Sequence, residues 1–191
     1  QAEVYGLDLS AEMLEQAKQK EGAQAIRWIL GDAQALPFPN RSFDCTFICL
    51  ALHHIEDKAR AIEEMYRVLK PGGRSLIWTV SHHQIRAFPL NEFFLSLAKI
   101  DLSRFPSIPQ IQEWMERAGF TAVRRKEVLF EEEIPTADYI ARVRNRYIST
   151  LDLLGEEEFA LGLKRLERSL PRRYGPRMIR RPRFTIVTGR R

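Results

Sequence analysis

The 191-residue chain is predicted to be an α/β protein with an open, doubly wound and mostly parallel sheet. Strand and helix signals alternate over the first 80 residues, and this order implies right-handed crossovers between parallel strands. The run Phe43–Leu50 is almost continuously apolar, as in a strand that is buried on both faces of such a sheet. Two later segments, 121–130 and 183–188, alternate like strands, and we expect them to pair antiparallel at one sheet edge.

The first elements follow from local signals. Glu3–Leu7 has the composition of a short strand, and Ser10 is a good N-cap for a helix that ends at Gly22. Ala25–Leu30 is the next strand, followed by the turn-rich sequence PFPNRS. After the apolar run, Ala59–Leu69 has the three-and-four spacing of apolar residues that predicts a one-faced helix.

Glycine and proline mark the next boundaries. The sequence Pro71-Gly72-Gly73 is expected to stop that helix and turn the chain sharply into a strand at Ser75–Val80. Phe88–Ile100 and Ile108–Ala118 are predicted helices, and Gly119 closes the second one.

A long insertion, Thr136–Pro171, separates the two late strands and is predicted to form two helices around Gly155. It is too long for a hairpin turn, so we expect it to pack over the ligand face as a lid. The predicted organisation is one domain, 1–191, with helical substrate-side lid insertions at 81–106 and 131–180.

Bulk composition excludes several classes of protein. Hydrophobic content of 45% with 29% charged residues is typical of a globular protein. No apolar run reaches the roughly 18 residues of a membrane helix, and no signal pattern opens the chain, so we expect a cytoplasmic protein without a membrane partner. Cys45 and Cys49 lie in one strand-like run and are expected to be buried and reduced, because a disulfide within a strand has poor geometry.

The net charge of +5 is unevenly spread. From Lys164 to Arg191 eleven Lys or Arg residues stand against the single Glu167, a local charge of +10. This polarity is what an acidic partner such as RNA, a phosphate or a carboxylate would require. A solvated helix face and a protected edge strand explain it equally well.

Two acidic residues end the first two predicted strands. Asp8 stands where open α/β sheets bind ligands, and its carboxylate can accept hydrogen bonds from both hydroxyls of a ribose. The alternative is that Asp8 only assists the helix start beside Ser10. Asp32, in Gly31-Asp32-Ala33, is a second candidate, and the alternative there is a turn-forming aspartate after a strand.

All four histidines occur in two adjacent pairs, His53-His54 and His82-His83, each just beyond a predicted strand. An imidazole can act as a general base near neutral pH, and His54 is the candidate for this role. The alternative is that these histidines are structural or surface residues. We expect no metal site, because consecutive residues of an extended chain point to opposite sides and the four rings cannot converge.

The sequence VYGLDLSAEML at 4–14 and the stretch Gly31–Gly73, which ends in MYRVLKPGG, carry a family resemblance. Together they resemble the class I S-adenosylmethionine-dependent methyltransferases, in the ubiquinone/menaquinone-biosynthesis-like branch (methyltransferase type 11). The resemblance implies a Rossmann-like fold and S-adenosylmethionine as the cofactor.

The resemblance also implies roles for individual residues. Asp8 would bind the ribose, while Asp32 and the backbone N–H of Ala33 would read the edge of the adenine. Cys49 would line the cofactor, and Leu9 and Met13 would contact the adenosine, with core packing as the alternative for these two. The MYRVLKPGG segment would be architectural.

The sequence departs from the family pattern at its start. The family begins with a strand and a D-x-G-x-G-x-G-like loop about 20 residues before the ribose-binding acid, whereas Asp8 has seven residues ahead of it and no G-x-G occurs in the chain. That loop cradles the methionine part of the cofactor and needs glycine for close backbone approach. We therefore expect the N-terminal strand and helix of the fold to be missing, as in an N-terminally truncated chain.

Three functions remain open from the sequence. The first is methyl transfer from S-adenosylmethionine to a small-molecule acceptor, although the quinone-biosynthesis enzymes tend to carry a different pair in place of His53-His54. The second is an RNA-modifying methyltransferase that uses the basic C-terminal region, and some tRNA-wobble methyltransferases share the pattern at Ala51–His54. The third is a truncated or degenerate Rossmann-like binding protein without catalysis. The oligomeric state is open.

Overall fold

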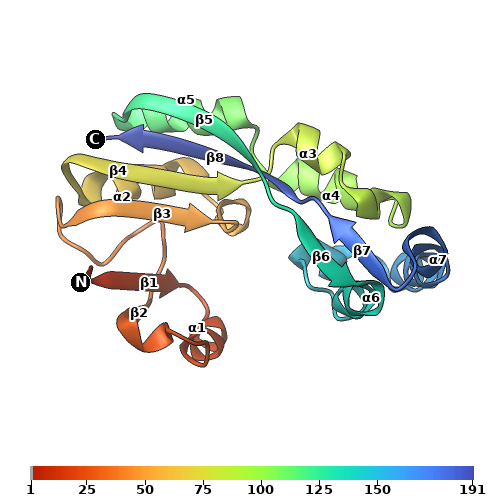
Figure 1. Ribbon diagram of the computed structural model, residues 1–191. Helices are drawn as coiled ribbons and strands as arrows, with labels where there is room; N and C mark the ends of the chain where they lie inside the picture. The colour runs from red at the N-terminus through yellow and green to blue at the C-terminus, as the bar shows by residue number, and fades with distance from the viewer. Residues whose placement is uncertain (1) are drawn as a thin grey trace. The chain divides into compact units, whose positions relative to one another are not determined.

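The computed structural model of the protein describes residues 2–191 (Figure 1). The strands are β1 Val4–Asp8, β2 Ile26–Leu30, β3 Phe43–Cys49, β4 Leu69–Thr79, β5 Thr121–Leu129, β6 Glu132–Pro135, β7 Arg177–Arg180 and β8 Arg183–Arg190. The α-helices are α1 Ala11–Lys18, α2 Lys58–Val68, α3 His82–Arg86, α4 Leu97–Arg104, α5 Ile108–Ala118, α6 Thr136–Arg144 and α7 Glu156–Tyr174. Short 3-10 helices lie at η1 Ala23–Ala25, η2 Leu52–His54, η3 Pro89–Glu92 and η4 Ser149–Leu153.

The strands form a mixed α/β arrangement in which the parallel direction prevails. The largest sheet has the order β3-β4-β8-β5, and the arrow of β8 points opposite to those of β3 and β4 (Figure 1). β1 and β2 pair in parallel, with Asp8 opposite Leu30, and β6 and β7 pair antiparallel. The predicted fold class is therefore confirmed, including the late strand pair at one edge, where β5 is the outermost strand.

The described residues divide into two compact units. Unit 1 comprises residues 2–77, Ile111–Arg124 and Thr188–Arg191. Unit 2 comprises Trp78–Gln110 and Arg125–Val187, and so contains both segments predicted to be lid insertions. The lid role itself stays a prediction.

The core of unit 1 depends on the amphipathic helix α2. Asp57 is the N-cap, and its side chain accepts a hydrogen bond from the backbone N–H of Arg60 (2.9 Å). Helical spacing then places one apolar face inward, so that Ala61, Ile62, Met65 and Val68 are all buried. At the other end of the helix, Nη1 of Arg191 donates to the carbonyls of Tyr66, Arg67 and Leu69. These bonds satisfy carbonyls that the helix end leaves open.

Unit 2 has a core of its own, built mainly from helices. Phe94 is completely buried at its centre and stacks on Phe159 of α7 with 5.8 Å between ring centroids. The close contact requires Gly162, because a Cβ atom there would lie 2.5 Å from the Phe94 ring and 2.7 Å from the carbonyl oxygen of Phe93. The other members of this core come from η3, α4, β6, α6, η4, α7 and β7 or from the residues directly after η3 and η4.

We expect Gly162→Ala to destabilise unit 2, because the added methyl group must displace an aromatic ring or backbone in a close-packed core. The loss in the free energy of unfolding should be about 1–3 kcal/mol, the range for overpacked cores. Urea unfolding followed by circular dichroism measures it. Gly155→Ala is the control, since a Cβ atom at Gly155 meets nothing within 4 Å. Equal stability of the two variants would contradict this account of the core.

The burial predicted for the apolar run 43–50 is wrong. Phe47 is 63% exposed and Leu50 39% exposed, and the free thiols of Cys45 and Cys49 are also exposed rather than buried. The reason is the sheet order, because β3 is an end strand of its sheet and has a hydrogen-bonded strand on one side only within residues 2–191. An apolar run shows that a segment has the composition of a buried strand. It does not show whether neighbouring elements cover that strand in the folded protein.

The helix before Pro71 ends at Val68, close to its predicted end, but the start of the next strand, the end of the insertion at Pro171 and one predicted helix differ from the structure. Pro71-Gly72-Gly73 lie inside β4, which begins directly after α2, and Gly72 takes the left-handed conformation that glycine tolerates (φ +80°). Pro171 lies inside α7, which continues to Tyr174, so the missing proline N–H costs one hydrogen bond near the helix end. The helix predicted at Phe88–Ile100 is divided into η3 and α4.

No helix among residues 2–191 is both long and apolar enough to cross a membrane.

Candidate functional site

The two candidate acids lie at the same end of paired strands. The backbone N–H of Gly31 donates to the carbonyl of Asp8 (2.9 Å), directly beyond the register pair of Asp8 with Leu30. Gly31 is followed by Asp32, so the carboxyl ends of β1 and β2 bring both carboxylates to one edge. This is the edge at which open parallel sheets bind ligands.

Asp8 has a local structural partner. Its Oδ1 accepts a hydrogen bond from the backbone N–H of Ser10 (2.8 Å), and Ser10 is the N-cap of α1, as predicted, accepting from Met13 N–H at 3.2 Å. The carboxylate thus assists the helix start, which was the alternative role. Two carboxylate oxygens offer more acceptor sites than one N–H uses, so this contact leaves room for a hydroxyl ligand.

Apolar side chains beside Asp8 face solvent. Leu9 is 73% exposed and Met13 is 51% exposed, so core packing, the alternative for both residues, is wrong. An exposed leucine and methionine next to a partly exposed carboxylate form a surface with both apolar and polar character. Such a surface fits a nucleoside, which has an apolar base and a hydroxylated sugar.

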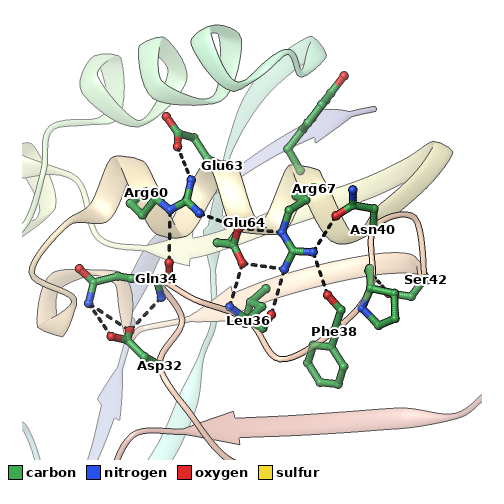
Figure 2. Close-up of polar contacts among 12 residues, drawn as sticks. Asp32, Gln34, Leu36, Phe38, Asn40, Ser42, Arg60, Glu63, Glu64 and Arg67 are labelled. Carbon is green, nitrogen blue, oxygen red and sulfur yellow. Dashed lines mark hydrogen bonds and ion pairs between the residues drawn. The ribbon is translucent and has the colours of Figure 1, made fainter.

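Asp32 is held by Gln34 (Figure 2). Its Oδ1 accepts from the Gln34 backbone N–H (2.8 Å), and both carboxylate oxygens accept from the Gln34 side-chain amide at 3.0 and 3.1 Å. These hydrogen bonds, the backbone one first, lower the pKa of Asp32 below its usual range, so the group is anionic at neutral pH. Ala33, which follows, is partly exposed. Sequence reasoning did not find Gln34, although its position two residues after the acid is typical of an aspartate turn.

Cys49 ends β3, and an unusual backbone follows it. Leu50 has φ +48°, a left-handed conformation that is rare for a bulky side chain and recurs at functional sites. β1 and β3 run in the same direction (Figure 1), and the rings of Tyr5 and Phe43 meet at 5.5 Å near the start of β3. Cys49 and Asp8 therefore both lie at carboxyl ends of strands in unit 1.

The two histidine pairs lie in different units and have different surroundings. His54 is exposed in η2 of unit 1, and its ring lies 4.0 Å from that of His53. His82 lies in α3 of unit 2, where its ring Nε2 is 2.8 Å from the carbonyl oxygen of Phe105. His82 thus has a structural partner, whereas the catalytic role of His54 stays a prediction. No group of three or more His, Cys, Asp or Glu side chains in residues 2–191 is arranged to hold a metal ion.

A polar network that sequence reasoning missed lies next to Asp32 (Figure 2). Its centre is Glu64 of α2, whose side chain is only 3% exposed. Hydrogen bonds from the Arg67 guanidinium lower the pKa of Glu64 and outweigh burial, which acts in the opposite direction. The available signal was the spacing of Glu64 and Arg67, but this i, i+3 pair is common on solvated helices.

Four arginines of the basic C-terminal region have acidic partners within the chain. Arg173 pairs with Glu92, Arg177 with Glu133, Arg180 with Glu132 and Arg181 with Glu131, at 2.5 to 3.0 Å. Three of these pairs join β7 and the residue after it to β6 and the residue before it. These arginines lie in regular elements or beside them, since α7 continues to Tyr174 and β7 spans Arg177–Arg180.

Comparison with known proteins gives a consistent result. Residues 1–77 match the family model described as "Methyltransferase domain". The demethylmenaquinone methyltransferase of Staphylococcus aureus is 34% identical over 149 residues, which cover 75% of this chain and 60% of that protein. A protein from Anabaena variabilis, described as a methyltransferase from an antibiotic biosynthesis pathway, has the same fold with a TM-score of 0.75 at 20% identity, covering 98% of this chain and 81% of its own.

A third similar protein was solved with a cofactor. The phosphoethanolamine N-methyltransferase 2 of Haemonchus contortus, in complex with S-adenosyl-L-methionine, matches 99% of this chain and 43% of its own with a TM-score of 0.56 at 21% identity. The chain spans about 60% of the length of the curated relatives it matches first. The predicted resemblance is confirmed: residues 1–77 match a methyltransferase family model, the chain is similar in sequence to members of the ubiquinone/menaquinone-biosynthesis-like branch, and it has the fold of the class I S-adenosylmethionine-dependent methyltransferases.

Proposed function

We propose that this chain serves in methyl transfer from S-adenosylmethionine to a small-molecule acceptor, and that unit 1 binds the adenosine part of the cofactor. The observation that carries the proposal is the placement of Asp8 and Asp32 at the adjacent carboxyl ends of β1 and β2, beside exposed Leu9. A carboxylate at this edge suits ribose hydroxyls, and a second one suits the exocyclic amine of adenine.

The residues present fit the cofactor. Asp8 would hold the ribose, Asp32 and the Ala33 N–H would hold the adenine edge, and Leu9 and Met13 would cover the base. Cys49, at the end of β3, would line the same ligand. When bound, the cofactor supplies a methyl group that its sulfonium activates, so the protein mainly has to position the acceptor and exclude water. His54 would act as a base where the acceptor carries a proton.

The acceptor that we favour is of the quinone type. The support comes from the relatives, since the enzyme of Staphylococcus aureus is named for demethylmenaquinone. The pair His53-His54 differs from the pair usual in quinone-biosynthesis enzymes, so the acceptor must be tested directly.

The test uses the complete natural protein. Calorimetric titration with S-adenosylhomocysteine measures cofactor binding, and mass spectrometry detects methyl transfer to a soluble demethylated naphthoquinol. Binding and transfer together support the proposal. Binding without transfer to this or other phenolic acceptors favours a non-catalytic binding protein, and the absence of binding contradicts the cofactor assignment.

We expect weak binding of bulk tRNA, since four of the arginines that could grip phosphates are already paired with Glu92 or with Glu131, Glu132 and Glu133. The dissociation constant at 150 mM salt should lie near the weak end of non-specific binding, about 0.1 mM. A filter-binding assay over a salt series measures it. Micromolar binding that is abolished by charge reversal of Arg172 and Arg177 would support the RNA-modifying alternative instead.

A further inference from the structure

The buried carboxylate of Glu64 has an unusual number of donors for a helix side chain. It accepts hydrogen bonds from Arg60 (3.1 Å), from Arg67 through two nitrogens (2.8 and 2.7 Å) and from the backbone N–H of Leu36 (2.8 Å). A buried charge is costly unless it is paired and hydrogen-bonded, and here both conditions are met. The Leu36 contact is the notable one, because it ties the helix to a loop 28 residues earlier in the sequence.

Arg67, which pairs with Glu64, also binds the loop that contains Leu36. Its guanidinium donates to the carbonyl oxygens of Leu36 (2.9 Å) and Phe38 (2.8 Å) and to the side chain of Asn40 (2.8 Å). The planar fork of an arginine can make these bonds and the pair with Glu64 at the same time, which a lysine cannot. Glu64 fixes the orientation of the fork, and the fork fixes the loop (Figure 2).

The network continues to Asp32 through Gln34. Arg60 donates from Nε to the carbonyl of Gln34 (3.3 Å), and the Gln34 Oε1 accepts from the backbone N–H of Asp57, the N-cap of α2 (2.8 Å). The amide nitrogen of the same Gln34 side chain donates to both oxygens of Asp32. The start of α2 and the candidate adenine-binding carboxylate are thus joined by one side chain.

From this connected geometry we infer that Glu64 is a positioning residue for the cofactor: through Arg67, Arg60 and Gln34 it holds the loop 32–42 so that the Asp32 carboxylate meets the adenine. The inference rests on the proposed function, since it assigns a role within that cofactor site. None of these four residues needs to touch the reacting atoms.

The main test replaces Glu64 by glutamine, which keeps the shape and one acceptor oxygen but removes the charge that orients Arg67. Affinity for S-adenosylhomocysteine, titrated on the complete protein, should fall about tenfold, the effect of losing one well-placed charged hydrogen bond. Glu63→Gln is the matched control, because it removes the same charge one residue earlier, from an exposed side chain that pairs with the same Arg60. The control should change the affinity less than about twofold.

Two measurements distinguish a positioning role of Glu64 from a role that is limited to the general stability of the fold. In steady-state kinetics, Glu64→Gln should raise KM for the cofactor while kcat and KM for the acceptor stay unchanged. In hydrogen–deuterium exchange, amides of 32–42 should exchange faster while those of α2 keep their protection. Equal acceleration in both segments, or an equal loss in kcat, would overturn the positioning role.

Two further variants keep the inference testable if Glu64→Gln does not fold. Arg67→Lys retains a charge beside Glu64 but cannot serve all its loop partners, and Gln34→Ala removes the link to Asp32 while it leaves Glu64 and Arg67 paired. Both should weaken cofactor binding in the same direction. If the unaltered protein binds and all variants bind equally well, the inference fails alone. If the unaltered protein does not bind, the proposed function fails with it.

Discussion

Replacing Asp8 by alanine is expected to weaken binding of S-adenosylhomocysteine by about 2–3 kcal/mol, because charge-assisted hydrogen bonds to the ribose are lost. The change also removes the acceptor for the Ser10 N–H at the start of α1. Because that contact lies at the partly exposed end of a strand, its loss should cost the fold about 1 kcal/mol or less. Calorimetric titration of the complete protein measures the affinity, and thermal unfolding checks the fold.

Two variants separate the ribose role of Asp8 from its helix-start role. Asp8→Asn keeps an oxygen that can accept from Ser10 and removes only the charge, so it should fold normally and still bind the cofactor more weakly. Asp44→Ala removes the same charge from an exposed side chain of β3 whose partner is Lys70, and it should not change the affinity. If Asp8→Asn binds like the unaltered protein, the aspartate acts in the turn and not on the ribose.

The largest loss of stability is expected for Phe94→Ala in unit 2. Phe94 is completely buried, and its ring fills the space between Phe159 and Gly162. Truncation removes a whole ring from a close-packed core and leaves a cavity, which costs about 3–5 kcal/mol of the free energy of unfolding. Since a domain of this size is stable by only about 5–15 kcal/mol, the variant should be close to unfolding at 37 °C.

Leu95→Ala is the matched control for Phe94→Ala. Leu95 is the next residue and is 76% exposed, so its truncation should change stability by less than about 0.5 kcal/mol. Urea unfolding followed by the fluorescence of Trp78, in a background with Trp28 and Trp114 replaced by phenylalanine, reports on unit 2, because Trp78 contacts Phe130 and Phe184 of the same unit. Equal midpoints for the two variants would mean that Phe94 is not central to this core.

The sequence predicted well those features that depend on neighbours in the chain. The strands before Asp8 and Asp32 and the N-cap at Ser10 all lie where predicted, because alternation, capping and turn chemistry act over a few residues. The parallel direction of the first strands followed from the crossover rule.

Features that depend on distant contacts could not be predicted in this way. Nothing near Glu64 indicates that Leu36 and Phe38 return to its helix, so the pair with Arg67 seemed an ordinary surface ion pair. The exposure of Phe47 follows from the position of β3 at the end of its sheet, and the hydropathy of the sequence does not reveal that position. The predicted insertion ended at Pro171, but its second helix continues to Tyr174, because a proline close to a helix end removes only one hydrogen bond.

The strand order also determines when this fold can be completed during synthesis. β8 leaves the ribosome after β4 and β5, yet it lies between them in the sheet, so each of these strands has an unpaired edge until residues 183–190 have been synthesised. The contact between Arg191 and Tyr66, which closes the end of α2, joins residues 125 positions apart. Such non-local pairing makes folding slow, and unpaired strand edges expose the nascent chain to aggregation. The C-terminal end of the helix that carries Glu64 therefore receives donors at two stages of synthesis: the backbone N–H groups of Arg41 and Ser42 are available early, and the Arg191 guanidinium only after β8.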